Sequence, residues 1–153
     1  MISPRTRSLV LLAGILVITA VAYGPVLSNQ FTNWDDTTYV LENPTLGDFS
    51  PGNLARIFSR YTMGNYHPLS LLSLSLDHRI GGTDPFVYHR TSLLLHGLCT
   101  ALVLLLARDL IGGWIAPALC ALIFGVHPLH VESVAWVSAR KDLLYACFYF
   151  AAC

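Results

Sequence analysis

Two neighbouring carboxylates, Asp35 and Asp36, are the residues of this 153-residue chain best suited to acid–base chemistry. They follow an apolar run from Leu9 to Leu27 by only a few residues, so we expect them beside a membrane surface. A carboxylate there can take a proton from an attacking hydroxyl. Because neighbouring side chains in an extended segment point in different directions, we expect only one of the two, with Asp36 preferred, to face a substrate.

A second polar cluster interrupts the apolar sequence far downstream, and it ends in the basic pair Arg140–Lys141. Arginine binds phosphate through a planar fork of donors, whereas lysine acts as a point charge. An acid opposite two cations suits transfer from a lipid-linked phosphate, since the cations neutralise the phosphate that leaves. The hypothesis assigns catalysis to Asp35 and Asp36, the donor phosphate to Arg140 and Lys141, and supporting contacts to His67, His127, His130 and Glu132.

Each of these patterns also has a purely structural interpretation. Asn33 or Asp35 could cap a short helix, and the basic pair could extend to lipid headgroups from a helix end. His67 could form a cap or an interface instead of reaching a substrate. His127, His130 and Glu132 could ligate a divalent metal ion, but Pro128 favours a turn in which the histidines are ordinary hydrogen-bonded loop residues.

Composition places the chain in a membrane. Hydrophobic residues make up 54% and charged residues 12%, with a mean hydropathy of +0.57. Nine basic residues balance nine acidic residues, which gives no reason to expect nucleic-acid binding. The four cysteines lie in apolar stretches without a CxxC pair, as expected for small buried residues.

The pattern of segments predicts an all-α, polytopic membrane protein. Residues 1–27 form a basic cytoplasmic tail and a first transmembrane helix, with Arg5 and Arg7 holding the tail in the cytoplasm. A cleaved signal peptide, with Ala20-Val21-Ala22 at the cleavage site, is the alternative. With the N-terminus in the cytoplasm and three spans before them, Arg140 and Lys141 would lie outside. This is against the positive-inside tendency, so something there should favour positive charge.

Residues 28–90 are predicted to form an extracytoplasmic loop that carries the acidic motif. Apolar residues recur at helical spacing in 51–62 and in 68–80, which indicates two interfacial helices along the membrane. Core helices of a small soluble loop domain are the alternative. Residues 91–153 then supply a second span, a turn near Gly112-Gly113, a short third span from 114 to 126, a short outer loop and the start of a truncated fourth span.

Several ordered motifs resemble one family. They include Phe31-Thr32-Asn33-Trp34-Asp35-Asp36, Glu42-Asn43-Pro44, Tyr66-His67-Pro68-Leu69-Ser70, Leu76-Asp77, Leu95-His96, His127-Pro128-Leu129-His130-Val131-Glu132 and Arg140-Lys141-Asp142-Leu143-Leu144. From Phe31 onward the chain resembles the N-terminal part of the multispanning O-mannosyltransferase-like proteins that carry tetratricopeptide repeats, with bacterial members as the closer match. The resemblance implies the GT-C class of glycosyltransferases, in which Asp35–Asp36 matches the acidic motif of the first outer loop and Arg140 matches the basic position near the donor phosphate.

We therefore expect an N-terminal part of a membrane glycosyltransferase, in a bacterial inner membrane, whose site faces the periplasm or exterior. It would transfer a sugar, mannose by resemblance, from a polyprenyl-phosphate donor to a hydroxyl of a protein or glycan. Two other functions stay open. One is a non-catalytic membrane anchor for a repeat protein, and the other is a metal-dependent membrane hydrolase that uses the histidines, Glu132 and the aspartates.

Overall fold

The computed structural model describes residues 4–153, and the first three residues of the basic tail lie outside this range. Every regular element in the described part is helical, which confirms the expected all-α class. The longer helices are α1 (Pro4–Tyr23), α2 (Pro51–Ser59), α3 (Pro68–Gly81), α4 (Pro85–Ile111), α5 (Ile115–Val126) and α7 (Arg140–Ala152). Short helical turns join them: η1 (Gly24–Ser28), η2 (Thr37–Leu41), η3 (Pro128–His130), α6 (Val131–Ala135) and η4 (Val137–Ala139).

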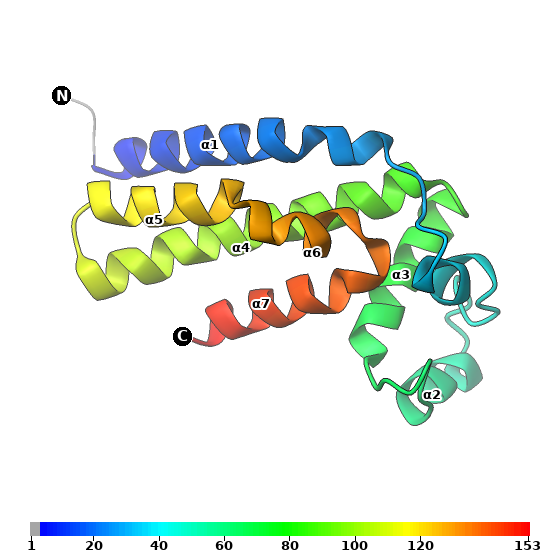
Figure 1. Cartoon of the computed structure of the whole chain (residues 1–153). Coiled ribbons are helices and arrows are strands. Elements are labelled where there is room, and N and C mark those ends of the chain that lie inside the picture. Colours follow the sequence, from blue (N-terminus) through cyan, green and yellow to red (C-terminus); the bar gives the residue numbers. More distant parts are fainter. Residues whose placement is uncertain (1–3) are drawn as a thin grey trace.

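Helices α1, α4 and α5 lie side by side, with α4 antiparallel to the other two, and α7 packs against α4 (Figure 1). The turn between α4 and α5 contains Gly112 and Gly113, with φ angles of 75° and 68°. Glycine adopts this left-handed conformation without the steric cost that a Cβ would bring. The tight reversal predicted near these glycines is therefore present, and α5 returns along α4.

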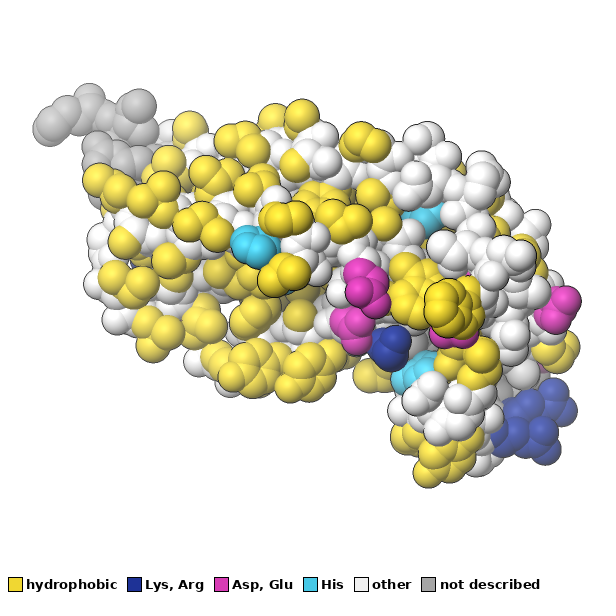
Figure 2. Space-filling model, in the orientation of Figure 1, with side chains coloured by type: hydrophobic (Ala, Val, Ile, Leu, Met, Phe, Trp, Pro, Cys, Tyr) yellow, Lys and Arg dark blue, Asp and Glu magenta, His cyan; other side chains and the backbone are white. Residues whose placement is uncertain are grey.

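Two helical segments are long and apolar enough to cross a membrane: Ser8–Ser28 and Pro85–Ile111. They coincide with the first two spans expected from the sequence. Their outward faces carry exposed side chains such as Leu9, Val21 and Leu94, which suit a lipid environment. Figure 2 shows that apolar side chains dominate the surface of the bundle.

The third expected span is short and bent. Helix α5 ends at Val126, and Pro128–Ala135 continues at an angle of 46°, so the pair forms either a broken span or a re-entrant loop. Proline cannot donate the backbone hydrogen bond that would continue α5, which accounts for the break. A third complete crossing therefore stays a prediction.

The two expected loop helices are present as α2 and α3 at one end of the bundle (Figure 1). Proline occupies the first turn of both, where no backbone donor is needed. Ser50 caps α2 by accepting a hydrogen bond from the Asn53 amide at 3.4 Å. A core that includes Tyr39, Ile57 and Tyr88 joins these helices to η2 and to the start of α4.

Candidate functional site

The acidic motif and the start of α7 meet at the same end of the bundle, because α1 and α5 run parallel to each other (Figure 1). Asp36 makes the connection directly. Its Oδ1 accepts hydrogen bonds from the amide of Ser138, at 2.9 Å, and from the Ser138 hydroxyl. Its Oδ2 accepts bonds from the amide and hydroxyl of Thr32, at 3.0 and 2.9 Å. Asp36 therefore joins two segments that lie 102 residues apart in the sequence.

Asp36 is only 1% exposed. Four donors hold its carboxylate, and hydrogen bonds to an ionised group are among the stronger ones in proteins. The carboxylate expected to face a substrate therefore holds the loop against α7 in this structure.

The two residues of the basic pair, Arg140 and Lys141, also differ in burial. Arg140 has no exposed surface, and it forms a buried ion pair with Asp77 on α3. Its guanidinium also donates to the Tyr88 carbonyl at 2.7 Å and to the Ser73 hydroxyl at 3.2 Å. Asp77 in turn accepts from the Thr91 hydroxyl at 2.7 Å. Arg140 thereby joins α7 to α3 and α4, and Asp77 supplies the local preference for positive charge that the sequence called for.

The neighbours of these two residues are accessible. Asp35 is partly exposed, and its carboxylate accepts no side-chain or loop hydrogen bond within residues 4–153. Lys141 is exposed, with its Nζ 5.8 Å from the centre of the Trp136 ring. The centre of the Trp136 ring lies 6.5 Å from the centre of the ring of Trp34, the residue that precedes Asp35. Acidic, basic and histidine side chains gather on this face near the end of the bundle (Figure 2).

His67 belongs to the same region. Its ring lies 5.2 Å from that of Tyr39, which is three residues after Asp36. Burial lowers the pKa of His67, and the positive charge of Lys141 lowers it further. Burial raises the pKa of Tyr39, and the negative charge of Asp35 acts in the same direction. His67 is therefore neutral at pH 7 and can both donate and accept hydrogen bonds.

His127 and His130 lie in a different place, at the bend after α5. The His127 Nδ1 accepts from the Leu129 amide at 3.2 Å, and its carbonyl accepts from the Tyr23 hydroxyl at 2.6 Å. The His130 ring packs 4.4 Å from Phe124. Glu132 is exposed in the first turn of α6. Within residues 4–153, no group of three or more His, Cys, Asp or Glu side chains is placed to hold a metal ion.

Sequence reasoning gave no role to Asp77 and Ser138, the two residues that fix the basic and acidic motifs in place. Asp77 did carry a signal, because it is an acid at a position where the helix repeat places core residues, among Leu71, Leu74 and other buried side chains of α3. Ser138 carried no comparable signal, since a serine in a short loop is ordinary.

The fold and site define a helical membrane protein with an accessible acid, an accessible cation and a neutral histidine at one end of its bundle. Protein O-mannosyl-transferase Tmtc1 of Drosophila melanogaster is 33% identical over an alignment of 140 residues that covers 86% of this chain and 16% of that protein. TMTC1 of Homo sapiens is 34% identical over 154 residues, covering 92% of this chain and 16% of its own length. TMTC4 of Mus musculus is 32% identical over 138 residues, covering 76% and 19%.

These similarities confirm the resemblance to the O-mannosyltransferases. The chain spans less than a fifth of the length of these curated relatives. No family model matches the chain, and no solved structure matches it significantly.

Proposed function

We propose that this chain forms the acidic-motif end of a membrane glycosyltransferase that transfers a sugar to a hydroxyl group of a protein. The similarity to protein O-mannosyl-transferases over 86% of the chain carries this proposal. We also propose that the sugar is mannose and that its carrier is a polyprenyl phosphate. The GT-C class, the tetratricopeptide repeats and a bacterial inner membrane stay predictions from the resemblance.

Asp35 is the proposed general base, and Asp36 is the residue that positions it. The carboxylate of Asp35 is accessible, whereas that of Asp36 already accepts four hydrogen bonds. In the proposed step the acceptor oxygen bonds to the anomeric carbon while its proton moves to Asp35. The bond from that carbon to the phosphate oxygen breaks, and the polyprenyl phosphate leaves with the electron pair.

Lys141 is the proposed contact for the departing phosphate. Its ammonium is exposed beside the Trp136 ring, whereas the buried guanidinium of Arg140 is engaged by Asp77. A cation close to the charge that develops on the leaving group stabilises the transition state. Arg140 supports this role indirectly, because it holds the first turn of α7 in place. His67, neutral and close to Lys141, is a proposed hydrogen-bonding partner for the sugar or the acceptor.

The proposed orientation puts this end of the bundle outside the cytoplasm. The basic residues Arg5 and Arg7 precede the first span, which favours a cytoplasmic N-terminus. Asp35 and α7 would then face the extracytoplasmic side together. Helices α2 and α3 would lie near the membrane surface, with exposed apolar residues such as Leu69, Leu76 and Ile80 available to the lipid interface.

A transfer assay in membranes tests the proposal. Full-length protein is incubated with radiolabelled polyprenyl-phosphate mannose and a serine- and threonine-rich acceptor peptide, and labelled peptide is counted. Asp35→Asn should lower turnover by about a hundredfold or more, because general-base catalysis contributes roughly that factor. Asp142→Asn, which changes another exposed acid of this end, is the control and should retain activity. Equal turnover for wild type and Asp35→Asn would remove the base from the mechanism, and an absence of turnover in wild type would favour the membrane-anchor alternative.

A further inference from the structure

A cavity of about 300 Å³ lies between η2 and α2, apart from the Asp35–Lys141 face. We call it the α2 pocket. Residues of η2, of the turn after it and of the C-terminal end of α2 line it, among them Thr38, Glu42, Asn43, Arg56, Arg60 and Tyr61. Most of these side chains can form hydrogen bonds, in contrast to the cavities along the bundle, which leucine and other apolar residues dominate.

Two arginines without an acidic partner give the α2 pocket its charge. Arg56 lies in the last turn of α2, Arg60 follows the helix directly with an extended backbone, and both line the pocket. Both are exposed, and neither guanidinium forms an ion pair within residues 4–153. One acid, Glu42, shares the lining, which leaves a net positive charge. Guanidinium groups bind carboxylates through paired hydrogen bonds, so an anionic group is the fitting ligand.

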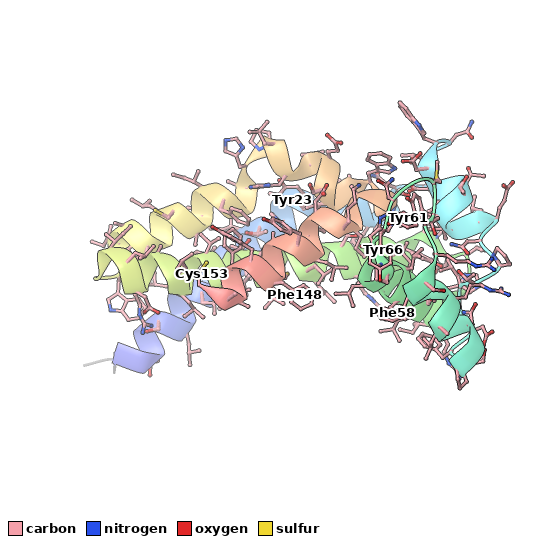
Figure 3. All side chains as sticks on the ribbon, turned by 90° about the horizontal axis from the view of Figure 1, so that it is seen from below. Tyr23, Phe58, Tyr61, Tyr66, Phe148 and Cys153 are labelled. Carbon is pink, nitrogen blue, oxygen red and sulfur yellow. The ribbon has the colours of Figure 1, made fainter. Side chains whose placement is uncertain are left out.

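Aromatic rings extend the α2 pocket on one side. Tyr61 lines it, and the Tyr61 and Tyr66 rings lie 5.7 Å apart across a tight turn. The Tyr66 hydroxyl donates to the Phe58 carbonyl at 2.9 Å, which fixes this ring against α2. Figure 3 shows Phe58, Tyr61 and Tyr66 together at the end of the molecule that carries α2 and α3. Tyrosines beside arginines are typical of surfaces that bind polypeptides.

The α2 pocket is also connected to the proposed base. Thr38, in its lining, belongs to η2, which begins directly after Asp35 and Asp36. The Tyr39 hydroxyl, from the same short helix, donates to the carbonyl of Thr62, another lining residue, at 3.2 Å. A bound polypeptide that reached from the α2 pocket to Asp35 would therefore lie along η2 alone.

We propose that the α2 pocket binds an acidic side chain of the acceptor polypeptide, a few residues away from the hydroxyl that receives the sugar. This inference rests on the proposed function, because it takes the acceptor to be a polypeptide. Arg56 and Arg60 bind the carboxylate, and Tyr61 packs against the neighbouring part of the peptide. The protein thereby selects hydroxyl residues that lie in acidic segments.

Peptide binding to the full-length protein in phosphatidylcholine nanodiscs tests the inference. The probes are two fluorescein-labelled threonine-containing peptides, one with aspartates flanking the threonine and one with asparagines at the same positions. Fluorescence anisotropy should show at least about fivefold tighter binding of the acidic peptide, as two exposed charge pairs would give. The preference should weaken as salt is raised.

Arg56→Gln/Arg60→Gln should abolish this preference. Arg90→Gln, an exposed arginine outside the lining, is the matched control and should retain it. Equal binding of both peptides to wild type, or an unchanged preference in the double variant, would overturn the inference. Submicellar dihexanoyl-phosphatidylglycerol is the competitor arm, and displacement by it without any acidic-peptide preference would assign the arginines to lipid headgroups instead.

The transfer assay separates this inference from the proposed function. Acid-selective binding without sugar transfer would remove the proposed function and leave the α2 pocket as a peptide site. Transfer with equal KM for both peptides would keep the function and remove the pocket from acceptor selection. Transfer with a lower KM for the acidic peptide, lost in Arg56→Gln/Arg60→Gln, supports both.

Discussion

Asp35 and Asp36 are sequence neighbours, as are Arg140 and Lys141, yet the structure separates the members of each pair. Asp36 and Arg140 are buried, and their charges are satisfied by Ser138 and Asp77. Asp35 and Lys141 are accessible. The difference teaches that one charge of each pair can position the segment while its neighbour stays available for chemistry. A buried charge is expensive to leave unpaired, whereas an exposed one costs little to remove.

The largest expected effect comes from the buried basic residue. Arg140→Ala leaves Asp77 charged and without its partner, which should lower the free energy of unfolding by about 3–5 kcal/mol. For a chain of this length the Tm should fall by about 10 °C. Thermal unfolding in detergent micelles, followed by circular dichroism, measures it. Lys141→Ala is the matched control, and a Tm for Arg140→Ala as high as that of the control would contradict the division between the two residues.

The next largest effect on stability comes from the close packing of α5 in the bundle. Gly125 lies where a Cβ would meet the Thr19 hydroxyl and the Thr100 side chain, so α5 packs closely on α1 and α4. Gly125→Ala should lower the free energy of unfolding by about 1–3 kcal/mol through overpacking. Gly14→Ala is the control, because its Cβ would meet no atom within 4 Å. The same Tm measurement applies, and equal values for both variants would show that the bundle does not need this close approach.

The exposed basic residue gives the smallest effect on stability. Lys141→Gln should change the free energy of unfolding by less than about 0.5 kcal/mol. It should raise the pKa of His67, because one cause of the lowered value, the positive charge, is removed while burial remains. Nuclear magnetic resonance titration of the histidine ring protons measures the change. An unaltered His67 titration would mean that Lys141 and His67 are not close.

His67 also determines in which direction the free energy of unfolding should change with pH. Its folded-state pKa is lowered from the ordinary value of 6.5, so its contribution to stability is complete above that pH and is lost as the pH falls. The loss should be smaller in Lys141→Gln.

Much of the fold could be predicted from the sequence. Apolar length indicated the first two spans, and helical spacing with Pro51 and Pro68 indicated α2 and α3. The bend of 46° after Val126 was harder, because Pro128 signals a break but not its angle. For the site, the sequence indicated that the acidic and basic motifs share one side. It could not tell which member of each pair is buried, since that depends on contacts with Ser138 and Asp77 that are distant along the chain.

Asp36 joins the acidic loop to the segment before α7 through its hydrogen bonds to Thr32 and Ser138. A double-mutant cycle with Asp36→Asn, Ser138→Ala and the combined variant tests it most directly, through the free energy of unfolding of each protein. We predict a coupling energy of about 1–2 kcal/mol, as residues in one hydrogen-bond network show. Effects that simply add, with no coupling between the two substitutions, would contradict the account.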